Sequence, residues 1–250
     1  MFLISMMIAL LCLICSICIN INWINDIACY LGYFLAIYLV TFVALIPGFN
    51  YVFTFISLLF HKKDKETSTK KEEDVTILIP VYNAKKSIKE TIESIQKQKY
   101  CGNIFVNIID DGSTDGTLEL LKSMNFDSNI TLIEAMHKGK AKALNKGLQK
   151  VKTAYTITID GDTVLHPLAV RNIMNKLVKS DKRTAATAGC LFVKNAKKSF
   201  ITKLQEWDYT LGIFGIKLVQ GGYHSTLVAQ GAFSAYKTEM LKEIGGWETV

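Results

Sequence analysis

The first 60 residues are almost uninterrupted in their apolar character. Residues 1–21 are uncharged and apolar, and a second apolar stretch, interrupted by Pro47-Gly48, continues to residue 60. About 20 apolar residues are needed for a helix to cross a bilayer. We therefore predict a hairpin of two transmembrane helices, at about 1–21 and 27–46. Residues 49–60 extend the second helix past a kink or lie in the membrane interface. The first stretch lacks the basic start of a signal peptide.

The charges beside these stretches predict how the hairpin lies in a membrane. The joining segment 22–26 is short and carries Asp26, whereas 61–65 holds one histidine and three lysines. Lysine and arginine are retained on the cytoplasmic side. We therefore expect a multi-pass protein of the cell (inner) membrane, with its N-terminus and its C-terminal region both cytoplasmic. The same lysines can hold the chain against anionic membrane lipid.

Beyond a charged linker at 61–74, strand and helix patterns alternate. Four apolar runs have the length of buried strands, and four segments carry apolar residues on one helical face. The predicted strands are 75–81, 104–109, 130–133 and 154–159. The predicted helices are 85–98, 117–124, 139–151 and 167–179. This alternation predicts an α/β domain over 75–250, with a mostly parallel sheet and helices on both faces.

Charge and cysteine content narrow the class of protein. Residues 1–60 contain one charged side chain, Asp26, so the net charge of +7 is the sum of −1 from this part and +8 from the remainder of the chain. The lysines there are scattered and follow no nucleic-acid-binding motif, so we expect no nucleic-acid partner. Neither the six cysteines nor the four histidines have the spacing of a zinc site. This pattern is typical of a reducing, cytoplasmic setting.

An acidic turn follows the strand predicted at 154–159. Asp160 and Asp162 flank Gly161, and residues two apart on an extended chain share one face. Two carboxylates on one face suit Mg²⁺ or Mn²⁺, which complete their coordination with water and phosphate oxygens. The same residue types are common in surface turns that bind no metal. The motif therefore indicates a metal site only together with a second acidic turn.

The second acidic turn, at 110–115, follows the strand predicted at 104–109. Asp110 and Asp111 can accept hydrogen bonds from a nucleobase N–H and from ribose hydroxyls. Residues 137–141 begin a helix, where free N–H groups favour anions. Because ligands sit beyond the carboxyl ends of parallel strands, these features predict a nucleoside-diphosphate site there. The sequence contains neither a P-loop motif nor a G-x-G-x-x-G motif, so P-loop ATP hydrolysis and dinucleotide redox chemistry lack support.

Four motifs occur in an order that resembles the family 2 glycosyltransferases. They are Pro80-Val81-Tyr82-Asn83, Asp110 to Thr117, Lys138 to Asn145, and Asp160-Gly161-Asp162. The resemblance covers about 75–250. It implies a GT-A fold, which is Rossmann-like, and the transfer of a sugar from a nucleotide diphosphate with inversion.

The resemblance also implies roles for individual residues. Asp111, helped by Asp110, would bind uracil or uridine. Asp160 and Asp162 would hold the metal and act as the catalytic carboxylates. The implied donor-binding residues are Pro80, Tyr82, Asn83, Asp110, Asp111, Lys138, Gly139, Lys140, Asp160 and Gly161.

The later region resembles the processive synthases of this family, most closely the bacterial synthases of poly-β-1,6-N-acetylglucosamine. The matching runs are Gln205 to Tyr209, Gln230 to Lys237 and Gly245 to Trp247. Without the resemblance, these aromatic residues and glycines are packing and turns. With it, a wall facing donor and acceptor is implied for Gln230, Gly231, Phe233 and Trp247. UDP-N-acetylglucosamine is then the favoured donor, and a growing glycan or a lipid is the acceptor.

The general base of the family is expected beyond residue 250. Family members present a Glu-Asp pair soon after a motif like Gly245-Gly246-Trp247, and Glu248 does not match that position. A Gln-x-x-Arg-Trp segment and further membrane helices come later in the family. Because direct displacement needs a base within reach of the attacking hydroxyl, we expect donor binding but little polymer from residues 1–250 alone. A partner subunit that supplies the C-terminal part would complete the enzyme.

Three functional hypotheses remain open at this point. The first is a membrane-bound inverting glycosyltransferase that uses a UDP-sugar for polysaccharide synthesis. The second is an inactive nucleotide-sugar-binding fragment or subunit that lacks the base. The third is a non-processive transferase to a polyprenyl phosphate or other lipid acceptor, a class that generally does not match the later motifs.

Overall fold

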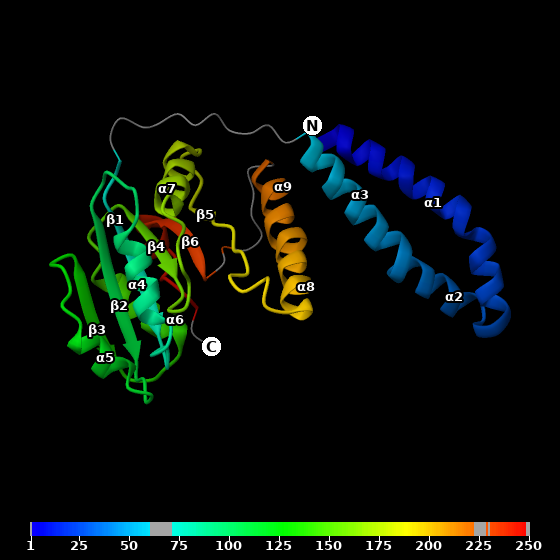
Figure 1. Ribbon diagram of the computed structural model, residues 1–250. Helices are drawn as coiled ribbons and strands as arrows, with labels where there is room; N and C mark the ends of the chain where they lie inside the picture. Colours follow the sequence, from blue (N-terminus) through cyan, green and yellow to red (C-terminus); the bar gives the residue numbers. More distant parts are fainter. Residues whose placement is uncertain (1, 61–71, 223–228, 230, 249–250) are drawn as a thin grey trace. The chain divides into compact units, whose positions relative to one another are not determined.

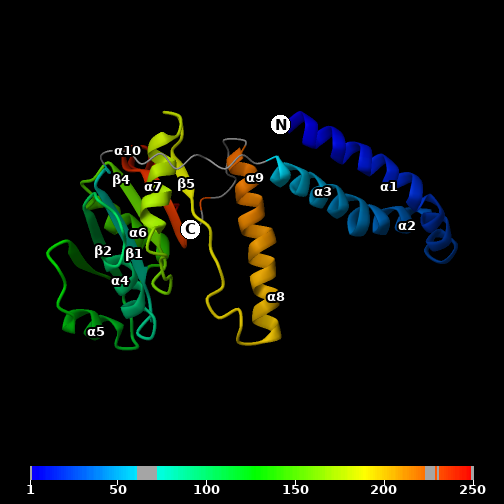
Figure 2. The same ribbon diagram turned by 45° about the horizontal axis from the view of Figure 1, so that its top comes forward.

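The computed structural model describes four parts of the chain, which are residues 2–60, 72–222, 229 and 231–248 (Figures 1 and 2). The contacts divide the chain into two compact units. One unit comprises Met1–Lys65 and Phe192–Ser225, and the other comprises Glu66–Leu191 and Thr226–Val250. Most of the predicted linker lies outside the described residues, and the predicted domain limits stay predictions.

Two long helical stretches form the N-terminal part of the first unit. Both are long and apolar enough to cross a membrane, and many of their large apolar side chains are exposed. The first stretch is α1, and the second runs without a break through α2, the π-helical η1 and α3. Their bounds are Phe2–Leu31 for α1, Tyr33–Val40 for α2, Thr41–Leu45 for η1 and Ile46–Leu59 for α3.

The turn between the two stretches lies later than the sequence predicts. The predicted junction at 22–26 is wrong, because α1 continues through this segment, which contains neither glycine nor proline. The helices separate at Gly32, whose φ of 77° is readily adopted by glycine and costly for other residues. Backbone freedom, and not the polarity of the segment, therefore sets the position of this turn.

Pro47 is accommodated inside the second stretch by a wider helical turn. A proline within a helix donates no hydrogen bond, and its ring clashes with the carbonyl four residues earlier. The π-helical η1 ends two residues before Pro47, and π-helical segments and prolines are the usual sites of helix distortion. The predicted break at Pro47-Gly48 thus takes the form of a π-helical segment, and the helix continues to Leu59.

The second unit is built on a six-stranded, mostly parallel sheet (Figure 1). The strand order is β3-β2-β1-β4-β6-β5; the first four strands are parallel, and β6 is antiparallel to both of its neighbours. The bounds are Val75–Val81 for β1, Ile104–Asp111 for β2, Ile130–Ala135 for β3, Tyr155–Ile159 for β4, Ala186–Ala188 for β5 and Phe233–Lys237 for β6. The β1–β4 ladder ends at Leu78, so Pro80, which has no N–H, lies beyond it.

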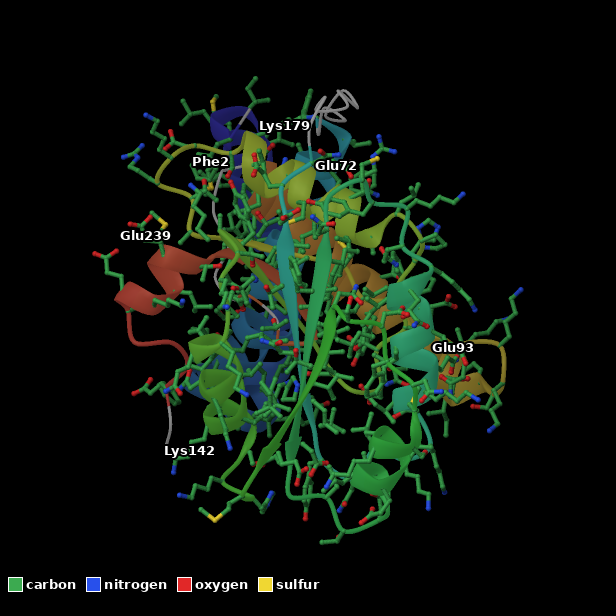
Figure 3. The ribbon with its side chains drawn as sticks, turned by 90° about the vertical axis from the view of Figure 1, so that its left-hand side faces the viewer. Phe2, Glu72, Glu93, Lys142, Lys179 and Glu239 are labelled. Atoms are coloured by element: carbon green, nitrogen blue, oxygen red, sulfur yellow. The ribbon has the colours of Figure 1, made fainter. Side chains whose placement is uncertain are left out.

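Helices cover both faces of the sheet, as predicted. Figure 3 shows α4 with Glu93 on one face, and α6 with Lys142 and α10 with Glu239 on the other. The larger apolar cluster lies between the sheet and α4, α5 and α7, and the smaller one faces α6 and α10. The bounds are Ile88–Gln96 for α4, Thr117–Ser123 for α5, Lys140–Gln149 for α6, Ala169–Lys179 for α7 and Thr238–Glu243 for α10. The predicted α/β fold class is therefore confirmed.

The chain enters the sheet through an ion pair between a buried carboxylate and a partly exposed guanidinium. Oε1 of Glu72, whose side chain is 5% exposed, lies 3.1 Å from Nε of Arg171 in α7 (Glu72 is labelled in Figure 3). Tyr100 donates a hydrogen bond to the carbonyl of Glu73. Burial, and to a lesser degree the carboxylate of Glu72, raises the pKa of Tyr100 well above its ordinary value. The hydroxyl therefore stays a donor, and the start of β1 is held in place.

A long helix between β5 and β6 belongs to the first unit. It runs through α8, the π-helical η2 and α9, and α9 contacts α3. The bounds are Phe200–Asp208 for α8, Tyr209–Gly215 for η2 and Ile216–Gly222 for α9. The sequence-based prediction places no element here.

Candidate functional site

The site lies where the strand order of the sheet reverses. From β1 the chain goes outward to β2 and β3, and it returns to the other side of β1 as β4. In open parallel sheets the crevice beyond the carboxyl ends at such a point holds ligands. Here the carboxyl ends carry Tyr82 after β1, Asp110 and Asp111 at the end of β2, and Asp160 after β4. The structure thus brings the two predicted acidic turns to one edge of the sheet.

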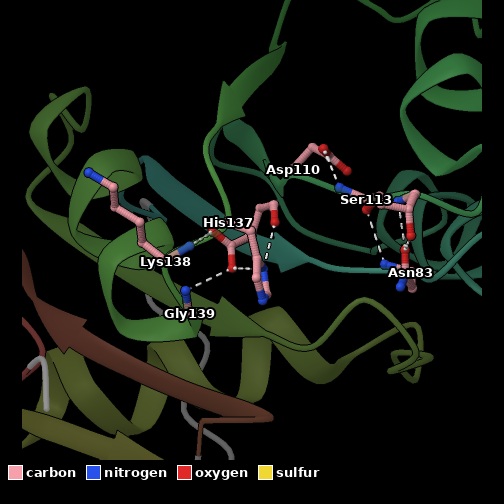
Figure 4. Close-up of polar contacts among 8 residues, drawn as sticks. Asn83, Asp110, Ser113, His137, Lys138 and Gly139 are labelled. Atoms are coloured by element: carbon pink, nitrogen blue, oxygen red, sulfur yellow. Dashed lines mark hydrogen bonds and ion pairs between the residues drawn. The ribbon is translucent and has the colours of Figure 1, made fainter.

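Asp111 holds the turn that precedes α6 (Figure 4). Its side chain is 5% exposed and accepts hydrogen bonds from the backbone N–H groups of Lys138 and Gly139, each at 3.0 Å. The side chain of Lys138 points away from this carboxylate (Figure 4). Two of the N–H groups expected to meet a diphosphate therefore bind Asp111 instead, because a helix start attracts the nearest anion.

His137 joins the same turn to Tyr82. The two rings are stacked, with centroids 4.2 Å apart and planes 22° apart. Nδ1 of His137 lies 2.9 Å from the backbone carbonyl oxygen of Asp111. Tyr82 is 48% exposed, so part of its ring stays open to a further planar group. From the sequence, His137 is predicted only to lie at the start of a helix, since its contact with Tyr82 depends on the fold.

Asp110 is buried and only partly paired. Its exposed fraction is 1%, and its Oδ2 accepts a hydrogen bond from the N–H of Ser113 at 3.1 Å (Figure 4). Its Oδ1 is buried and has no hydrogen-bond partner among the residues that the structure describes. An unpaired buried acceptor costs free energy. At the carboxyl end of β2, Asp110 therefore has one buried acceptor oxygen that no described residue satisfies.

Asn83 ties the turn after β1 to the turn after β2. Its φ is 51°, its side-chain oxygen accepts from the N–H of Thr114 at 2.8 Å, and its own N–H donates to Oγ of Ser113 at 3.0 Å (Figure 4). Nearby, a hydrogen bond from the hydroxyl of Thr117 holds the pKa of Asp115 below its usual value. These contacts give Asn83 and Asp115 positioning roles, and the role of Asp115 is not predictable from the sequence.

The backbone of the Asp160-Gly161-Asp162 turn is held by hydrogen bonds from the first half of α4 and its N-cap residue. The hydroxyls of Ser87 and Thr91 each donate to the carbonyl of Gly161 at 3.1 Å. Gly161 is buried, the side chain of Asp160 is 31% exposed, and Asp162 is exposed. The two carboxylates thus stand at the open edge of a turn whose backbone is held. Ser87 and Thr91 escaped the sequence analysis, because their partner lies about 70 residues further along the chain.

Lys140, the first residue of α6, forms an ion pair with Oδ1 of Asp160. The ammonium is a cation at the position that the sequence predicts for a divalent ion. Among the described residues, no group of three or more His, Cys, Asp or Glu side chains could hold a metal. A pair of carboxylates fits Mg²⁺ or Mn²⁺ that takes its other ligands from water and phosphate. The residues present are therefore compatible with the predicted ion.

The residues of the predicted wall lie in different surroundings. A Cβ on Gly231 would lie 3.1 Å from Nζ of Lys140, so Gly231 borders the site. Phe233 is 7% exposed and belongs to the larger apolar cluster, where a Cβ on Gly189 would come within 2.1 Å of its ring. Gln230 lies outside the described residues. Phe233 thus supports the site from the core.

Trp247 is held in place by α6 through its backbone. Nδ2 of Asn145 donates to the carbonyl of Trp247 at 2.8 Å, and the N–H of Trp247 donates to Oδ1 of Asn145 at 2.9 Å. A Cβ on Gly246, whose φ is 85°, would lie 2.2 Å from that oxygen. The Trp247 ring packs edge-on against Tyr236. Asn145 belongs to the motif that begins at Lys138, and its partner could not be read from the sequence.

Two curated relatives are poly-beta-1,6-N-acetyl-D-glucosamine synthases. The chain is 29% identical over 178 residues to the synthase of Staphylococcus epidermidis (strain RP62A), which is 71% of this chain and 42% of that protein. It is 28% identical to the synthase of Staphylococcus aureus (strain COL), with the same coverage. The chain therefore spans less than half the length of these relatives.

A solved structure of similar fold is the mannosyltransferase PcManGT from Pyrobaculum calidifontis in complex with GDP-Man and Mn²⁺. Its TM-score is 0.61 at 22% identity, and the match covers 80% of this chain and 55% of that one. Together with the sheet order, this likeness confirms the predicted GT-A fold. The family model described as glycosyl transferase family 2 matches residues 76–245. This match covers more than half of the chain and all four motifs, so the chain belongs to glycosyl transferase family 2.

Proposed function

We propose that this chain binds the donor of a membrane-bound, inverting glycosyltransferase that uses a UDP-sugar for polysaccharide synthesis. The proposed donor is UDP-N-acetylglucosamine, because the curated relatives are named as synthases of a polymer of that sugar. The observation that carries the proposal is that Tyr82, Asp110 and Asp160 gather at one edge of the sheet. A nucleoside diphosphate has a base that can stack on the aromatic ring and donate to the unpaired acceptor. Its diphosphate needs a cation, which the carboxylate can hold.

The end of β2 supplies the proposed contact to uracil. Oδ1 of Asp110 is buried without a described partner, whereas both oxygens of Asp111 bind backbone N–H groups. A carboxylate oxygen can accept a hydrogen bond from the ring N–H of uracil, and the exposed part of Tyr82 offers a stacking surface. We therefore assign base recognition to Asp110, and we assign to Asp111 the role of holding the 137–139 turn. The sequence-based hypothesis gave base recognition to Asp111, with Asp110 as its helper.

Asp160 and Asp162 are the proposed ligands of a divalent cation. The mannosyltransferase of similar fold was in complex with Mn²⁺, and Asp160 already accepts the cationic ammonium of Lys140. Such an ion, when bound, offsets the negative charge that develops on a leaving diphosphate. Gly161 places the two carboxylates, while Ser87 and Thr91 keep its backbone from shifting.

In the proposed reaction an acceptor hydroxyl attacks the anomeric carbon of the donor sugar. The bond from that carbon to the diphosphate oxygen breaks, its electron pair leaves with UDP, and the configuration at the carbon is inverted. The hydroxyl proton passes to a general base within hydrogen-bond reach. We propose that a segment or partner subunit outside residues 1–250 supplies this base, and that the acceptor is a growing glycan or a lipid.

The two N-terminal helical stretches are the proposed membrane anchor. Their length and composition suit membrane spans, and the lysine-rich sequence at 61–65 favours a cytoplasmic position for the rest of the chain. A donor site on the cytoplasmic side of the cell (inner) membrane has direct access to soluble UDP-sugars.

Calorimetric titration of the full chain in lipid nanodiscs tests the donor assignment. With Mn²⁺ present, UDP and UDP-N-acetylglucosamine should bind at least about tenfold more tightly than GDP or ADP. The reason is that a site built to hydrogen-bond one base leaves buried groups unpaired with another. Equal binding of UDP, GDP and ADP would contradict the proposed contact of Asp110 with uracil.

Replacing Lys140 with methionine should strengthen Mn²⁺ binding in the absence of nucleotide. The ammonium and the ion compete for Asp160, and the Lys140 side chain is 50% exposed. Ion pairs of this kind contribute up to about 1 kcal/mol, so the gain should be up to about fivefold. The EPR signal of free Mn²⁺ measures it. Lys142→Met removes an equal charge from the solvent side of α6 (Figure 3) and should change nothing. Unaltered affinity in Lys140→Met would exclude the competition.

A further inference from the structure

Helix α1 of the hairpin carries two exposed asparagines on the side that its neighbours leave uncovered. Asn22 and Asn25 are exposed, and neither side chain has a hydrogen-bond partner among the described residues. The buried residues of α1 are Ser5 and Ala9. Because successive residues of a helix are about 100° apart, these two lie on nearly the opposite side from the asparagines. The contacts of α1 with α2 and α3 therefore leave both amides open to another molecule.

The uncovered face of α1 follows a seven-residue repeat, with spacings of three and four residues in turn. We call this face the seam; its members are Ile8, Leu11, Cys15, Cys18, Asn22, Asn25 and Cys29. Ile8 is partly exposed and the other members are exposed. Alternating spacings of three and four residues are typical of the line along which two helices pack side by side. The seam therefore has the pattern of a helix–helix contact.

The two asparagines of the seam lie between apolar stretches. α1 continues through them to Leu31, and residues 27–40 contain no charged or amide side chain. Covering the apolar residues on both sides with lipid brings the two amides to membrane depth as well. An amide without a hydrogen-bond partner in an apolar medium costs free energy, and amides on membrane helices bond to neighbouring helices. The seam is therefore stabilised by a second helix that offers hydrogen-bonding groups at the same depth.

The chemistry of the seam is self-complementary. An asparagine amide both donates and accepts hydrogen bonds, so Asn22 and Asn25 can each pair with the same residue of a second copy. Asp26, the one charged residue of 1–60, lies about 60° from the centre of the seam. Two copies that meet along the seam therefore do not place their carboxylates face to face.

We propose that α1 helices from two copies of this chain pack in parallel along the seam within the membrane. Two copies in one membrane have the same orientation, so a two-fold axis along the membrane normal places each seam residue opposite its own copy. The layers at Asn22 and Asn25 form hydrogen bonds between the helices, and the short side chains of the cysteine layers leave room for close approach. This inference rests on the proposed membrane anchoring of the hairpin.

Disulfide cross-linking through the cysteines of α1 tests this proposal on the full chain in liposomes. Four proteins each keep one of these cysteines and have alanine at every other cysteine; the positions kept are Cys12, Cys15, Cys18 and Cys29. A disulfide needs Cα atoms within about 7 Å of each other, which the seam positions reach in the proposed dimer. The three seam cysteines should therefore give covalent dimers on oxidation. Cys12, about 100° from the centre of the seam, should give at least about fivefold less.

The asparagines provide the second arm of the experiment. Energy transfer between chains labelled at the exposed Cys101, followed as the lipid content rises, measures the dissociation constant of the dimer. Asn22→Leu and Asn25→Leu should each weaken the dimer by about 3- to 30-fold, because a hydrogen bond between membrane helices is lost. Asn20→Leu is the matched control and should leave the dimer unchanged, since Asn20 donates to the carbonyl of Ser16 in its own helix at 2.7 Å.

Three outcomes would overturn the proposal. Equal cross-linking at Cys12 and at the seam cysteines indicates random collision, absence of energy transfer at high protein content indicates a monomer, and an unchanged dimer in both Asn22→Leu and Asn25→Leu indicates a contact elsewhere. Extraction of the chain from the liposomes by alkaline carbonate would remove the membrane anchoring on which the inference rests. UDP binding in the same liposomes reports the proposed donor site separately, because the seam and the donor site belong to different units of the chain.

Discussion

Asp160→Asn and Asp162→Asn should each abolish the dependence of UDP binding on Mn²⁺. The turn that carries them is held by Ser87 and Thr91 through the carbonyl of Gly161, so the substitutions remove a charge without moving the backbone. Loss of a partner outside the coordination shell already lowers metal affinity about 10- to 100-fold. Loss of a ligand carboxylate should therefore weaken UDP binding in Mn²⁺ by at least about 100-fold. Calorimetry with and without Mn²⁺ measures this effect.

The matched control is Asp127→Asn, which removes an equal charge from an exposed position at the other end of β3. It should bind Mn²⁺ and UDP like the unmodified chain. Circular dichroism should show the same helix and strand content for all three variants. Retention of Mn²⁺-dependent UDP binding in either Asp160→Asn or Asp162→Asn would show that the ion is held elsewhere.

The sequence predicts the parallel half of the fold well, because buried parallel strands are read as continuous apolar runs. β1 occupies the predicted residues 75–81, and the acidic turns mark the ends of β2 and β4. The strand β6 is not predicted from the sequence. Its sequence Phe-Ser-Ala-Tyr-Lys mixes polar and apolar residues, and its pairing with β4 is antiparallel over a separation of nearly 80 residues. Local periodicity does not carry that information.

For the site, the sequence motifs identify the residues but not the role of each one. Ile108 belongs to the larger apolar cluster and Ile109 to the smaller one, so successive side chains of β2 face opposite sides. Asp110 and Asp111 continue this alternation, which is readable from the sequence. The sequence does not reveal that Asp111 accepts hydrogen bonds from the N–H groups of Lys138 and Gly139, because this depends on where α6 returns to the sheet.

This division of roles predicts that Asp110→Asn and Asp111→Asn have opposite consequences. In Asp110→Asn, the amide oxygen can still accept from Ser113, while the NH₂ replaces the unpaired Oδ1. Stability should be little changed or higher, because a buried and only partly paired carboxylate is replaced by a neutral amide, whose burial costs less free energy. UDP binding should fall about 10- to 100-fold, since a donor then faces the N–H of uracil and a hydrogen bond to a charged group, about 1.5–3 kcal/mol, is lost.

In Asp111→Asn, one of the two backbone N–H groups at Lys138 and Gly139 loses its acceptor and faces an NH₂ group. The loss of stability should be about 2–3 kcal/mol, which lowers the apparent melting temperature by about 4–12 °C for a chain of this size. Thermal scans and UDP titrations on the same nanodisc samples separate the two effects. If Asp110→Asn melts early and binds UDP normally, or if Asp111→Asn binds UDP poorly without any loss of stability, the two roles are exchanged and Asp111 reads the base.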